Sequence, residues 1–294
     1  MGSLFTIVGY GSDTGKASRI AMASFAMVDS LNLIMSDYNP ESELMRLSRL
    51  SGNGKWIPVS DELYEIIRES LCWSRRTDGL FDITVGAYSQ LWRRAGRKEK
   101  IPDTLMLNNA ASVVGFKYIK LNKNKQAVKL TKPGIQLDLG GIAKGYTVDR
   151  IFELFRSNGF DAVLVDGGGD IRTGENPPGS RGWKIVIETQ YSTDSIAYVE
   201  NSAIATSGDL FRFTEINGIR YSHIINPRTG YGITIPRTVT VTAPDCTTAD
   251  VLSSFLSISG PDKGFKSLDK LDGVDAIIVE IENGDKKIYR YSGR

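Results

Sequence analysis

Apolar residues recur at helical spacing in two N-terminal segments, and both segments are predicted to be helices. In the first, Ala17 to Met35, the apolar positions that return to one face are Ile20, Phe25, Val28, Leu31 and Ile34. In the second, Asp61 to Arg76, Ser60 is a suitable N-cap and Gly79 follows as a stop signal. The dipeptide Asn39-Pro40 breaks the chain between them.

Two further helices are predicted in the second half of the chain. Gly141 to about Asn158 places apolar residues on one side and ends before Gly159. The other runs from about Thr248 to Ile258. The stretch Arg93 to Lys100, in contrast, is dominated by basic residues and is predicted to be a solvated loop.

Short apolar runs between turn residues predict strands throughout the chain. The predicted strands are Phe5–Gly11, Ile135–Leu139, Ala162–Val165, Trp183–Glu188, Ile204–Ser207, Ile219–Ile224, Val239–Val241, Ala276–Ile281 and Ile288–Tyr291. Because helices and strands do not alternate regularly, a doubly wound parallel sheet is disfavoured. We predict an α+β fold with mixed, mostly antiparallel sheets and packed helices, in a single domain over residues 1–294.

The composition is that of an ordinary soluble globular protein. The chain has 294 residues, of which 41% are hydrophobic and 24% charged, and its formal net charge is +2. This balance argues against nucleic acid as a partner, and no apolar run reaches the roughly 18 residues of a transmembrane segment. With one histidine in the chain, a multi-histidine metal site is excluded. The two cysteines lack the spacing of a metal or redox motif.

Two glycine-rich segments fail the familiar nucleotide-binding patterns. GYGSDTGKAS (Gly9 to Ser18) has Ala17 where a phosphate-binding P-loop needs Ser or Thr after the lysine. VDGGGDIRTG (Val165 to Gly174) lacks the G-x-G-x-x-G spacing of a dinucleotide-binding turn and is not followed by a helix. Neither classical loop is therefore expected.

A more specific segment is DLGGIAKGY, from Asp138 to Tyr146. Gly140 and Gly141 allow a ligand to approach the backbone closely, and the following helix N-terminus favours anions. Lys144, one turn into the helix, can reach a phosphate, and the Asp138 carboxylate can accept hydrogen bonds from a ring or sugar. The alternative is tight helix-on-sheet packing with a solvated lysine, and the segment alone does not decide between them.

The segment TTADVLSSF (Thr247 to Phe255) places Asp250 and Ser254 four residues apart on one helix face. Mg²⁺ takes few protein oxygens and completes its octahedron with water and substrate phosphates. Together the two segments suit a magnesium-bound diphosphate. The alternative is that Thr247 or Thr248 caps the helix and Asp250 complements its dipole.

Two other segments offer groups that suit a planar ring. In TDGLFDITVG, Phe81 can cover a ring while Asp82 fixes its edge; a turn with a core phenylalanine is the alternative. In MSDYNPESEL, Met35 and Tyr38 can contact a ring; a helix exit followed by a second cap at Ser42 is the alternative.

The only histidine, His223, lies in YSHIINPRTG, on a predicted strand before the Asn226-Pro227 turn. Histidine is the usual proton acceptor near neutral pH, which makes His223 a candidate general base. A lone histidine is more often a structural residue, and this alternative stays open.

In this order, the segments resemble those of the ApbE family, the FAD:protein FMN transferases. The resemblance runs from about Met35 to Ser259, and its most specific elements are DLGGIAKGY, SHIINPRTG and the TAD helix. It implies a T-fold-like α+β architecture and a Mg²⁺-dependent enzyme. The implied reaction transfers the FMN half of FAD to a Thr or Ser hydroxyl of a partner protein, such as a membrane redox-complex subunit, and releases AMP.

The resemblance also implies a role for individual residues. Those that would hold FAD are Met35, Tyr38, Leu80, Phe81, Asp82, Asp138, Lys144 and Ile224. Gly141 would offer its carbonyl to Mg²⁺ beside Asp250 and Ser254. The family often has Thr where Ser254 stands, and Ser253 is an alternate ligand. Asp250 and His223 are the predicted catalytic residues.

Two other functions remain open at this point: an FAD pyrophosphatase giving FMN and AMP, and a non-catalytic FAD carrier. Family members are usually periplasmic enzymes or exported lipoproteins, so the resemblance implies a bacterial periplasmic location. The start MGSLFTIVGYG has no signal-peptide pattern, and the expectation is that the natural leader is missing from this sequence.

Overall fold

The computed structural model describes residues 3–189, 192–208, 213–282 and 285–293. The helices are α1 (Thr14–Met35), α2 (Glu43–Arg49), α3 (Asp61–Arg76), α4 (Gly86–Lys98), α5 (Thr104–Ala111), α6 (Ala143–Ser157) and α7 (Cys246–Leu268), with a short 3-10 helix at Phe116–Tyr118. The strands are β1 (Thr6–Gly9), β2 (Ile57–Pro58), β3 (Ile119–Asn122), β4 (Ala127–Leu130), β5 (Val163–Asp166), β6 (Asp170–Thr173), β7 (Trp183–Thr189), β8 (Ser192–Val199), β9 (Ala203–Gly208), β10 (Phe213–Ile216), β11 (Ile219–Ser222), β12 (Arg237–Ala243), β13 (Asp275–Glu282) and β14 (Asp285–Ser292).

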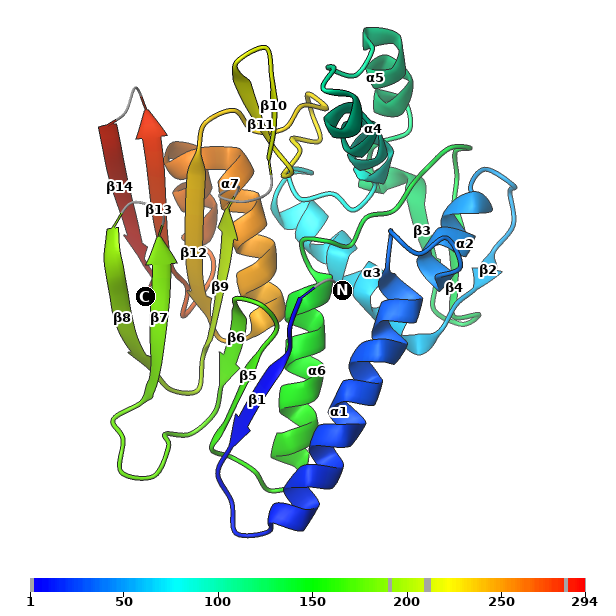
Figure 1. Cartoon of the computed structure of the whole chain (residues 1–294). Coiled ribbons are helices and arrows are strands. Elements are labelled where there is room, and N and C mark those ends of the chain that lie inside the picture. Colours follow the sequence, from blue (N-terminus) through cyan, green and yellow to red (C-terminus); the bar gives the residue numbers. More distant parts are fainter. Residues whose placement is uncertain (1–2, 190–191, 209–212, 283–284, 294) are drawn as a thin grey trace.

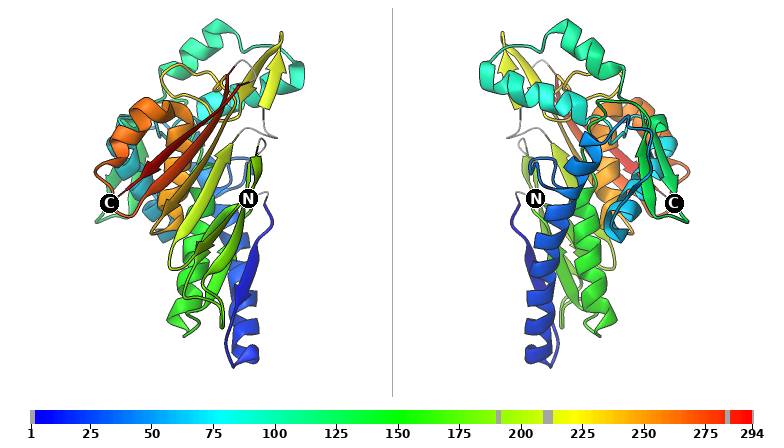
Figure 2. Two further views of the ribbon diagram at one scale, coloured as in Figure 1. Left: turned by 90° about the vertical axis from the view of Figure 1, so that its left-hand side faces the viewer. Right: turned by 90° about the vertical axis from the view of Figure 1, so that its right-hand side faces the viewer.

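The largest sheet has the order β1-β5-β6-β9-β12-β13-β14, and every neighbouring pair in it is antiparallel. Helices α6 and α7 pack on one face of this sheet, and α1 packs against α6 (Figure 1). The side views in Figure 2 show the sheet on one side and these helices on the other. The prediction of an α+β fold with mostly antiparallel sheets is therefore confirmed. The prediction of one domain over residues 1–294 stays a prediction.

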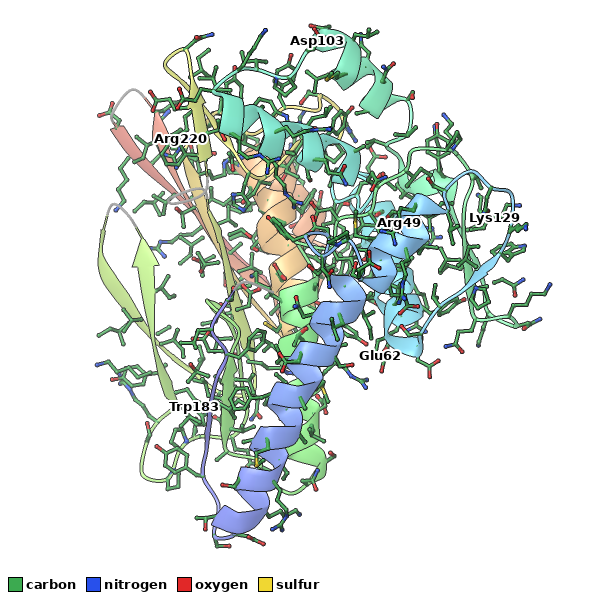
Figure 3. The ribbon with its side chains drawn as sticks, turned by 45° about the vertical axis from the view of Figure 1, so that its right-hand side comes forward. Arg49, Glu62, Asp103, Lys129, Trp183 and Arg220 are labelled. Atoms are coloured by element: carbon green, nitrogen blue, oxygen red, sulfur yellow. The ribbon has the colours of Figure 1, made fainter. Side chains whose placement is uncertain are left out.

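Smaller elements surround this centre. The three-stranded sheet β2-β4-β3 lies with α2 and α3 on one side of the molecule, and the hairpins β7-β8 and β10-β11 are separate two-stranded sheets. In Figure 3, Arg49, Glu62 and Lys129 lie on the right, on α2, α3 and β4, whereas Trp183 of β7 lies on the left. Among the described residues, no helix is both long and apolar enough to span a bilayer.

The predicted caps explain where the N-terminal helices begin. Ser60 caps α3 as predicted, because its side chain accepts a hydrogen bond from the Leu63 amide. Ser42 caps α2 in the same way, through the Met45 amide. On α1, Ile20 and Leu31 are buried as predicted, but Phe25 is 46% exposed. Phe25 therefore does not share the buried face of α1 with Ile20 and Leu31.

The prediction of a solvated loop from Arg93 to Lys100 is also wrong. Most of this stretch belongs to α4, whose opposite face is apolar. That face packs with α5 and the β10-β11 hairpin in a cluster separate from the main core. The buried members of this cluster are Tyr88, Leu91, Trp92, Ala95, Leu107, Ala110, Ile216, Tyr221 and Ile225. Arg94 and Arg97 lie on the solvent side of this amphipathic helix.

Two predicted strands differ from the structure. Ile135 to Leu139 is buried at alternate positions, but it joins no sheet and makes only an isolated parallel bridge between Gln136 and Val85. The strand β11 ends at Ser222, so His223 and the residue after it follow the strand instead of lying on it. Both segments lead directly into the candidate site.

Candidate active site

The segments DLGGIAKGY and TTADVLSSF lie against each other in the structure. The first leads into α6, and the second forms the first turns of α7. A Cβ atom on Gly141 would lie 2.9 Å from the Ser254 hydroxyl oxygen and 3.3 Å from the Phe81 ring. A side chain at position 141 would therefore press on both neighbours, and glycine lets the backbone pass between them. Gly141, Phe81 and Ser254, which come from three distant parts of the sequence, are brought together at one point.

One turn further along α6, and at least one turn nearer the start of α7, Gly145 lies directly against α7. An added Cβ on Gly145 would collide with the backbone carbonyl of Cys246 and would lie 2.9 Å from the Asp250 Cβ. The Gly145 amide donates a hydrogen bond of 3.1 Å to Asp250 Oδ2. Asp250 is only 2% exposed, and this contact fixes the orientation of its carboxylate.

A side chain of α6, that of Asp149, holds the start of α7 in place. The carboxylate of Asp149 accepts hydrogen bonds from the amides of Cys246 and Thr247, at 2.9 and 2.8 Å, and from the Thr247 hydroxyl. It also pairs with Arg172 at 2.8 Å. Asp149 thus satisfies amides that the helix itself leaves unpaired at its N-terminus.

Lys144 joins two acidic residues at the same junction. Its ammonium nitrogen forms an ion pair with Asp170 Oδ2 and lies 3.9 Å from Asp250 Oδ1. Burial alone would lower the pKa of Lys144, but the two carboxylates raise it overall, so the side chain is charged. Burial, reinforced by the nearby Asp250 carboxylate, raises the pKa of Asp170 to about 8, although Lys144 opposes this shift.

Asp170 was not predicted as part of the site. It lies at the start of β6, directly after the glycine turn of VDGGGDIRTG, and is 1% exposed. Nothing in its local sequence indicates a partner 26 residues away. The pairing follows from the antiparallel β5-β6 hairpin, which returns the chain beside α6.

The predicted Mg²⁺ ligands can be tested against the donors that this junction offers. Among the described residues there is no cluster of three or more His, Cys, Asp or Glu side chains that would hold a metal alone. The predicted set of the Gly141 carbonyl, the Asp250 carboxylate and the Ser254 hydroxyl has one carboxylate and two neutral oxygens. This set suits Mg²⁺, which keeps several waters and substrate oxygens in its coordination sphere.

The structure also distinguishes the two neighbouring serines. Ser253 is fully buried; its hydroxyl lies 2.9 Å from the Asp250 carbonyl and 2.7 Å from the Ser207 hydroxyl. Ser254 is partly exposed, and its hydroxyl is 3.4 Å from the same Ser207 oxygen. Ser254 is therefore the more accessible donor, and its role as a ligand stays a prediction.

A second group of predicted residues lies around Arg93 of α4. The Arg93 guanidinium stacks on the Tyr38 ring, with its carbon 3.8 Å from the ring centre. It forms an ion pair with Asp37 and lies 3.6 Å from Asp138 Oδ2. Met35 ends α1 nearby and is buried, whereas Tyr38 is 75% exposed. Sequence reasoning missed Arg93 because it assigned this stretch to a loop.

The two carboxylates near Arg93, those of Asp37 and Asp138, have different surroundings. Burial raises the pKa of Asp37 to about 6, with a further contribution from Asp138, while Arg93 lowers it. Asp138 Oδ1 also accepts a hydrogen bond of 2.8 Å from the Gly140 amide. This bond turns the Asp138 side chain toward the glycine pair and links the two halves of the candidate site.

The remaining predicted residues lie at the edges of this region. Leu80 is partly buried against the main core. Asp82 is buried, and its carboxylate accepts hydrogen bonds from the Thr84 amide at 2.9 Å and the Phe116 amide at 2.7 Å. Its oxygens therefore hold the local loop together, and its predicted role toward FAD is untested. Burial raises the pKa of Asp82, and these hydrogen bonds oppose the shift.

His223 and Ile224 follow the β10-β11 hairpin. His223 is exposed, and the Ile224 amide donates a hydrogen bond of 3.1 Å to the Ser222 hydroxyl. The next residue, Ile225, is buried in the cluster that contains Trp92 of α4. The chain two residues after the histidine is thus held against α4, and the role of His223 as a base stays a prediction.

Comparison with known proteins decides the family. The model of the ApbE family matches residues 1–278. The chain belongs to the ApbE family. The relatives include the FAD:protein FMN transferase of Haemophilus influenzae, 32% identical over 285 residues, or 93% of this chain and 82% of the relative. That of Vibrio cholerae is also 32% identical, over 89% of this chain and 79% of the relative.

Solved structures of the ApbE family share the fold of this chain. A variant of the flavin transferase ApbE from Vibrio cholerae aligns with a TM-score of 0.89 and 28% identity, over 99% of this chain and 95% of that chain. The ApbE protein of Thermotoga maritima aligns with a TM-score of 0.86 and 30% identity, over 97% and 93% of the two chains. The sequence-based assignment to this family is therefore confirmed.

Proposed function

We propose that this protein transfers the FMN half of FAD to a threonine or serine hydroxyl of a partner protein, in a Mg²⁺-dependent reaction that releases AMP. The observation that carries the proposal is the junction of α6 and α7. There Gly141 lies against Ser254, and the Asp250 carboxylate is oriented by the Gly145 amide. The relatives named FAD:protein FMN transferase support the same reaction class.

The charges at this junction suit a metal-bound diphosphate. Lys144 lies between the carboxyl groups of Asp170 and Asp250, and a bound cation would favour the ionised form of both. When bound, Mg²⁺ would supply charge neutralisation for the diphosphate and for the leaving AMP. Lys144 is held charged at the start of α6, where it and the helix N-terminus attract phosphate oxygens.

The transfer step exchanges one P–O bond for another. The acceptor hydroxyl oxygen forms a bond to the FMN phosphorus, and the bridging P–O bond to AMP breaks. The hydroxyl proton passes to the imidazole of His223, and AMP leaves with the bridging oxygen. At the flavin end, the exposed Tyr38 ring and the nearby Asp138 would hold the isoalloxazine.

The direct test combines the purified protein, FAD, Mg²⁺ and soluble domains of candidate redox subunits from the same organism. We expect one domain to become fluorescent on a denaturing gel and AMP to form in equal amount. Omission of Mg²⁺ should abolish both products. Tight FAD binding without any labelled domain would contradict the proposal.

The same assay separates the two other functions. An FAD pyrophosphatase would give FMN and AMP without an acceptor, which chromatography of the products detects. A carrier would leave FAD intact for hours with Mg²⁺ present. The comparisons with named transferases favour the transferase over both.

His223→Ala tests the proposed base. We expect the variant to lower kcat for transfer while leaving the FAD dissociation constant within about twofold, because a base acts mainly in the transition state. An equal loss in both measurements would make His223 a binding residue.

The proposed location is the bacterial periplasm, by analogy with the usual location of the family. Fractionation of cells that express the full natural gene tests this, and recovery in the cytoplasmic fraction would contradict it.

A further inference from the structure

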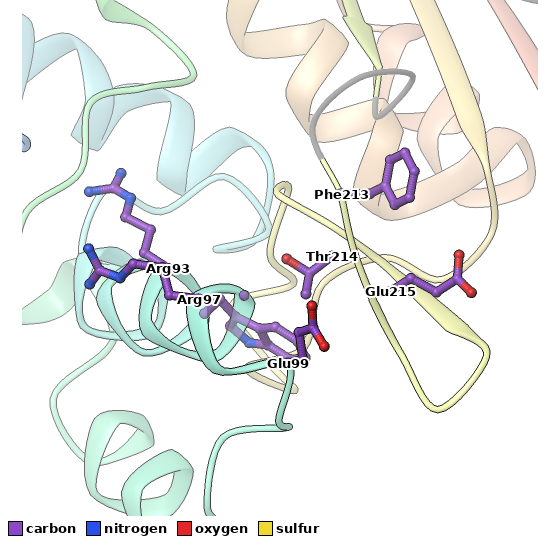
Figure 4. A pocket seen from close by; sticks show the side chains of 8 residues that line it. Arg93, Arg97, Glu99, Phe213, Thr214 and Glu215 are labelled. Carbon is purple, nitrogen blue, oxygen red and sulfur yellow. The ribbon is translucent and has the colours of Figure 1, made fainter.

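A cavity of about 430 Å³ lies between α4 and β10, apart from the α6–α7 junction. Its lining residues are Trp92, Arg93, Gly96, Arg97, Glu99, Phe213, Thr214 and Glu215. Figure 4 shows Thr214 directed from the hairpin toward α4. An added Cβ on Gly96 would lie 2.9 Å from the Thr214 hydroxyl oxygen, so Gly96 allows the helix and strand to approach. The volume is in the range of roughly 300–1,000 Å³ typical of ligand-binding sites.

One wall of the cavity is continuous with the flavin end of the candidate site. Arg93 lines the cavity and also contacts Tyr38, Asp37 and Asp138 through its guanidinium. A molecule in the cavity therefore lies one side chain away from the residues proposed to hold the isoalloxazine.

The other wall is continuous with the proposed base. Phe213 of β10 is paired in register with Ser222 of β11, and His223 is the next residue along the chain. Paired residues in an antiparallel ladder have their Cα atoms roughly 4.5–5.5 Å apart. The strand that lines the cavity thus runs beside the strand that ends at His223.

The charges that line the cavity are balanced. Two arginines and two glutamates give no net charge, and Arg93 is already paired with Asp37. A diphosphate therefore finds no surplus of positive charge here. Among the described residues, Arg97, Glu99 and Glu215 have no ion-pair partner, so they are available to an incoming molecule that carries both signs of charge.

The shape and side chains suit a polypeptide. Three consecutive residues of β10 line the cavity although successive side chains of a strand point to opposite faces, so the cavity follows the strand itself. Within the described part of the chain, β10 pairs only with β11, which leaves its other edge for an extended segment. Tryptophan and arginine are also the residues that most often carry binding energy at protein interfaces.

We propose that the cavity between α4 and β10 receives the polypeptide segment that carries the acceptor hydroxyl. This inference rests on the proposed transferase function. It places the acceptor between the flavin end, reached through Arg93, and the base at the end of the hairpin. Because the cavity lies apart from the α6–α7 junction, changes at its lining residues other than Arg93 should affect the acceptor and not the nucleotide.

The test compares two charge-reversal variants on α4 with each other. Both are assayed on an acceptor domain that the wild-type protein labels. Arg97→Glu alters the cavity, whereas Arg94→Glu makes the same change at an exposed position that does not line it. We expect Arg97→Glu to raise KM for the acceptor about tenfold, as loss of an interface arginine does, with the FAD dissociation constant unchanged. Arg94→Glu should change neither.

A second measurement does not depend on transfer. A benzophenone amino acid is placed at position 97 or at position 94, and the protein is irradiated with the acceptor domain without FAD. We expect a covalent adduct from position 97 and none from position 94. Equal adducts from both positions, or none from position 97, would overturn the inference.

The outcomes separate this inference from the proposed function. A wild-type protein that labels no acceptor refutes the proposed function before any variant is made. A different result would overturn only the inference. If the wild type labels the acceptor, and Arg97→Glu weakens FAD binding but leaves the KM for the acceptor unchanged, the cavity belongs to the nucleotide site.

Discussion

The two halves of the candidate site are built in opposite ways. At the α6–α7 junction, Asp250 is buried and held by the Gly145 amide, and a single added methyl group at position 145 has no room. At the flavin end, Tyr38 is three-quarters exposed, and its ring is covered by the guanidinium of Arg93.

In the proposed reaction, this difference corresponds to two tasks. Charge stabilisation requires donors that are already in place before the reaction, and the helix junction provides them. A large planar ring must enter and leave, and an exposed tyrosine can adjust to it at little cost. The junction should therefore be sensitive to small changes in shape and charge, and the flavin end should tolerate them.

The largest effect is expected from Asp250→Asn at the junction. The amide keeps the size of the side chain but removes the charge that Mg²⁺ needs, so transfer should fall on the order of 10³-fold. The fold should persist, because Lys144 keeps its pairing with Asp170. Transfer rates over a range of Mg²⁺ concentrations measure this. Asp262→Asn, exposed beyond the kink of α7 at Gly260, is the control. Activity above a tenth of wild type would contradict the assignment.

Next comes Gly145→Ala, which tests the close packing of α6 on α7. The methyl group would collide with the Cys246 carbonyl, and the free energy of unfolding should fall by about 1–3 kcal/mol. Urea unfolding measures it. Gly15→Ala, also in a helix but with only ordinary contacts, should be neutral or stabilising by less than about 1 kcal/mol. Equal effects from both changes would show that the junction is no tighter than other helices.

A smaller effect is expected from Asp37→Asn at the flavin end. Burial raises the pKa of Asp37 from 3.8 to about 6, so the folded state holds this proton more tightly than the unfolded chain. The stabilisation is complete below about pH 4 and is lost as the pH rises through 6. Because the asparagine cannot ionise, the variant should gain about 2 kcal/mol relative to wild type between pH 4 and pH 7.5. Urea unfolding at both pH values measures this, and a constant difference would contradict it.

The smallest effect is expected from Tyr38→Ala. The side chain is so exposed that the free energy of unfolding should change by less than about 0.5 kcal/mol. FAD affinity should fall about threefold, as expected for the loss of one ring contact. Fluorescence titration measures the affinity, with Tyr10→Ala, another exposed tyrosine, as the control. Unchanged FAD affinity would remove Tyr38 from the flavin site.

Sequence reasoning predicted that the two segments of the junction lie together, because their signals are local; their roles toward FAD and Mg²⁺ stay predictions. The glycine pair, the lysine and the i, i+4 spacing of Asp250 and Ser254 each indicate a ligand-binding helix end, and the structure brings Gly141 beside Ser254. The antiparallel α+β class followed from the irregular order of helices and strands. The partners Asp149 and Asp170 carry no local signal, because only the tertiary fold brings them to α7 and Lys144.

The flavin end was predicted less completely because α4 was not recognised. Its basic residues hid an apolar face that does recur at helical spacing, at Tyr88, Leu91, Trp92 and Ala95. Without α4, neither Arg93 nor the cavity beside β10 could be anticipated. Ile135 to Leu139 failed for another reason: alternation of apolar residues predicts an extended buried segment, but not whether a neighbouring strand pairs with it.

The contacts of Gly145 and Asp149 with α7 have a consequence for how the protein loses activity on heating. These residues stand one turn apart on α6 and hold two successive turns of α7, at Asp250 and at Cys246. Fraying of the first turn of α7 would break the bonds to Asp149, and fraying that reached the second turn would also break the bond between Gly145 and Asp250, so partial opening gains little. Amide hydrogens at Cys246 and Thr247 should therefore exchange with deuterium only in molecules that unfold completely. The temperature at which catalysis ends and the midpoint of melting should then coincide.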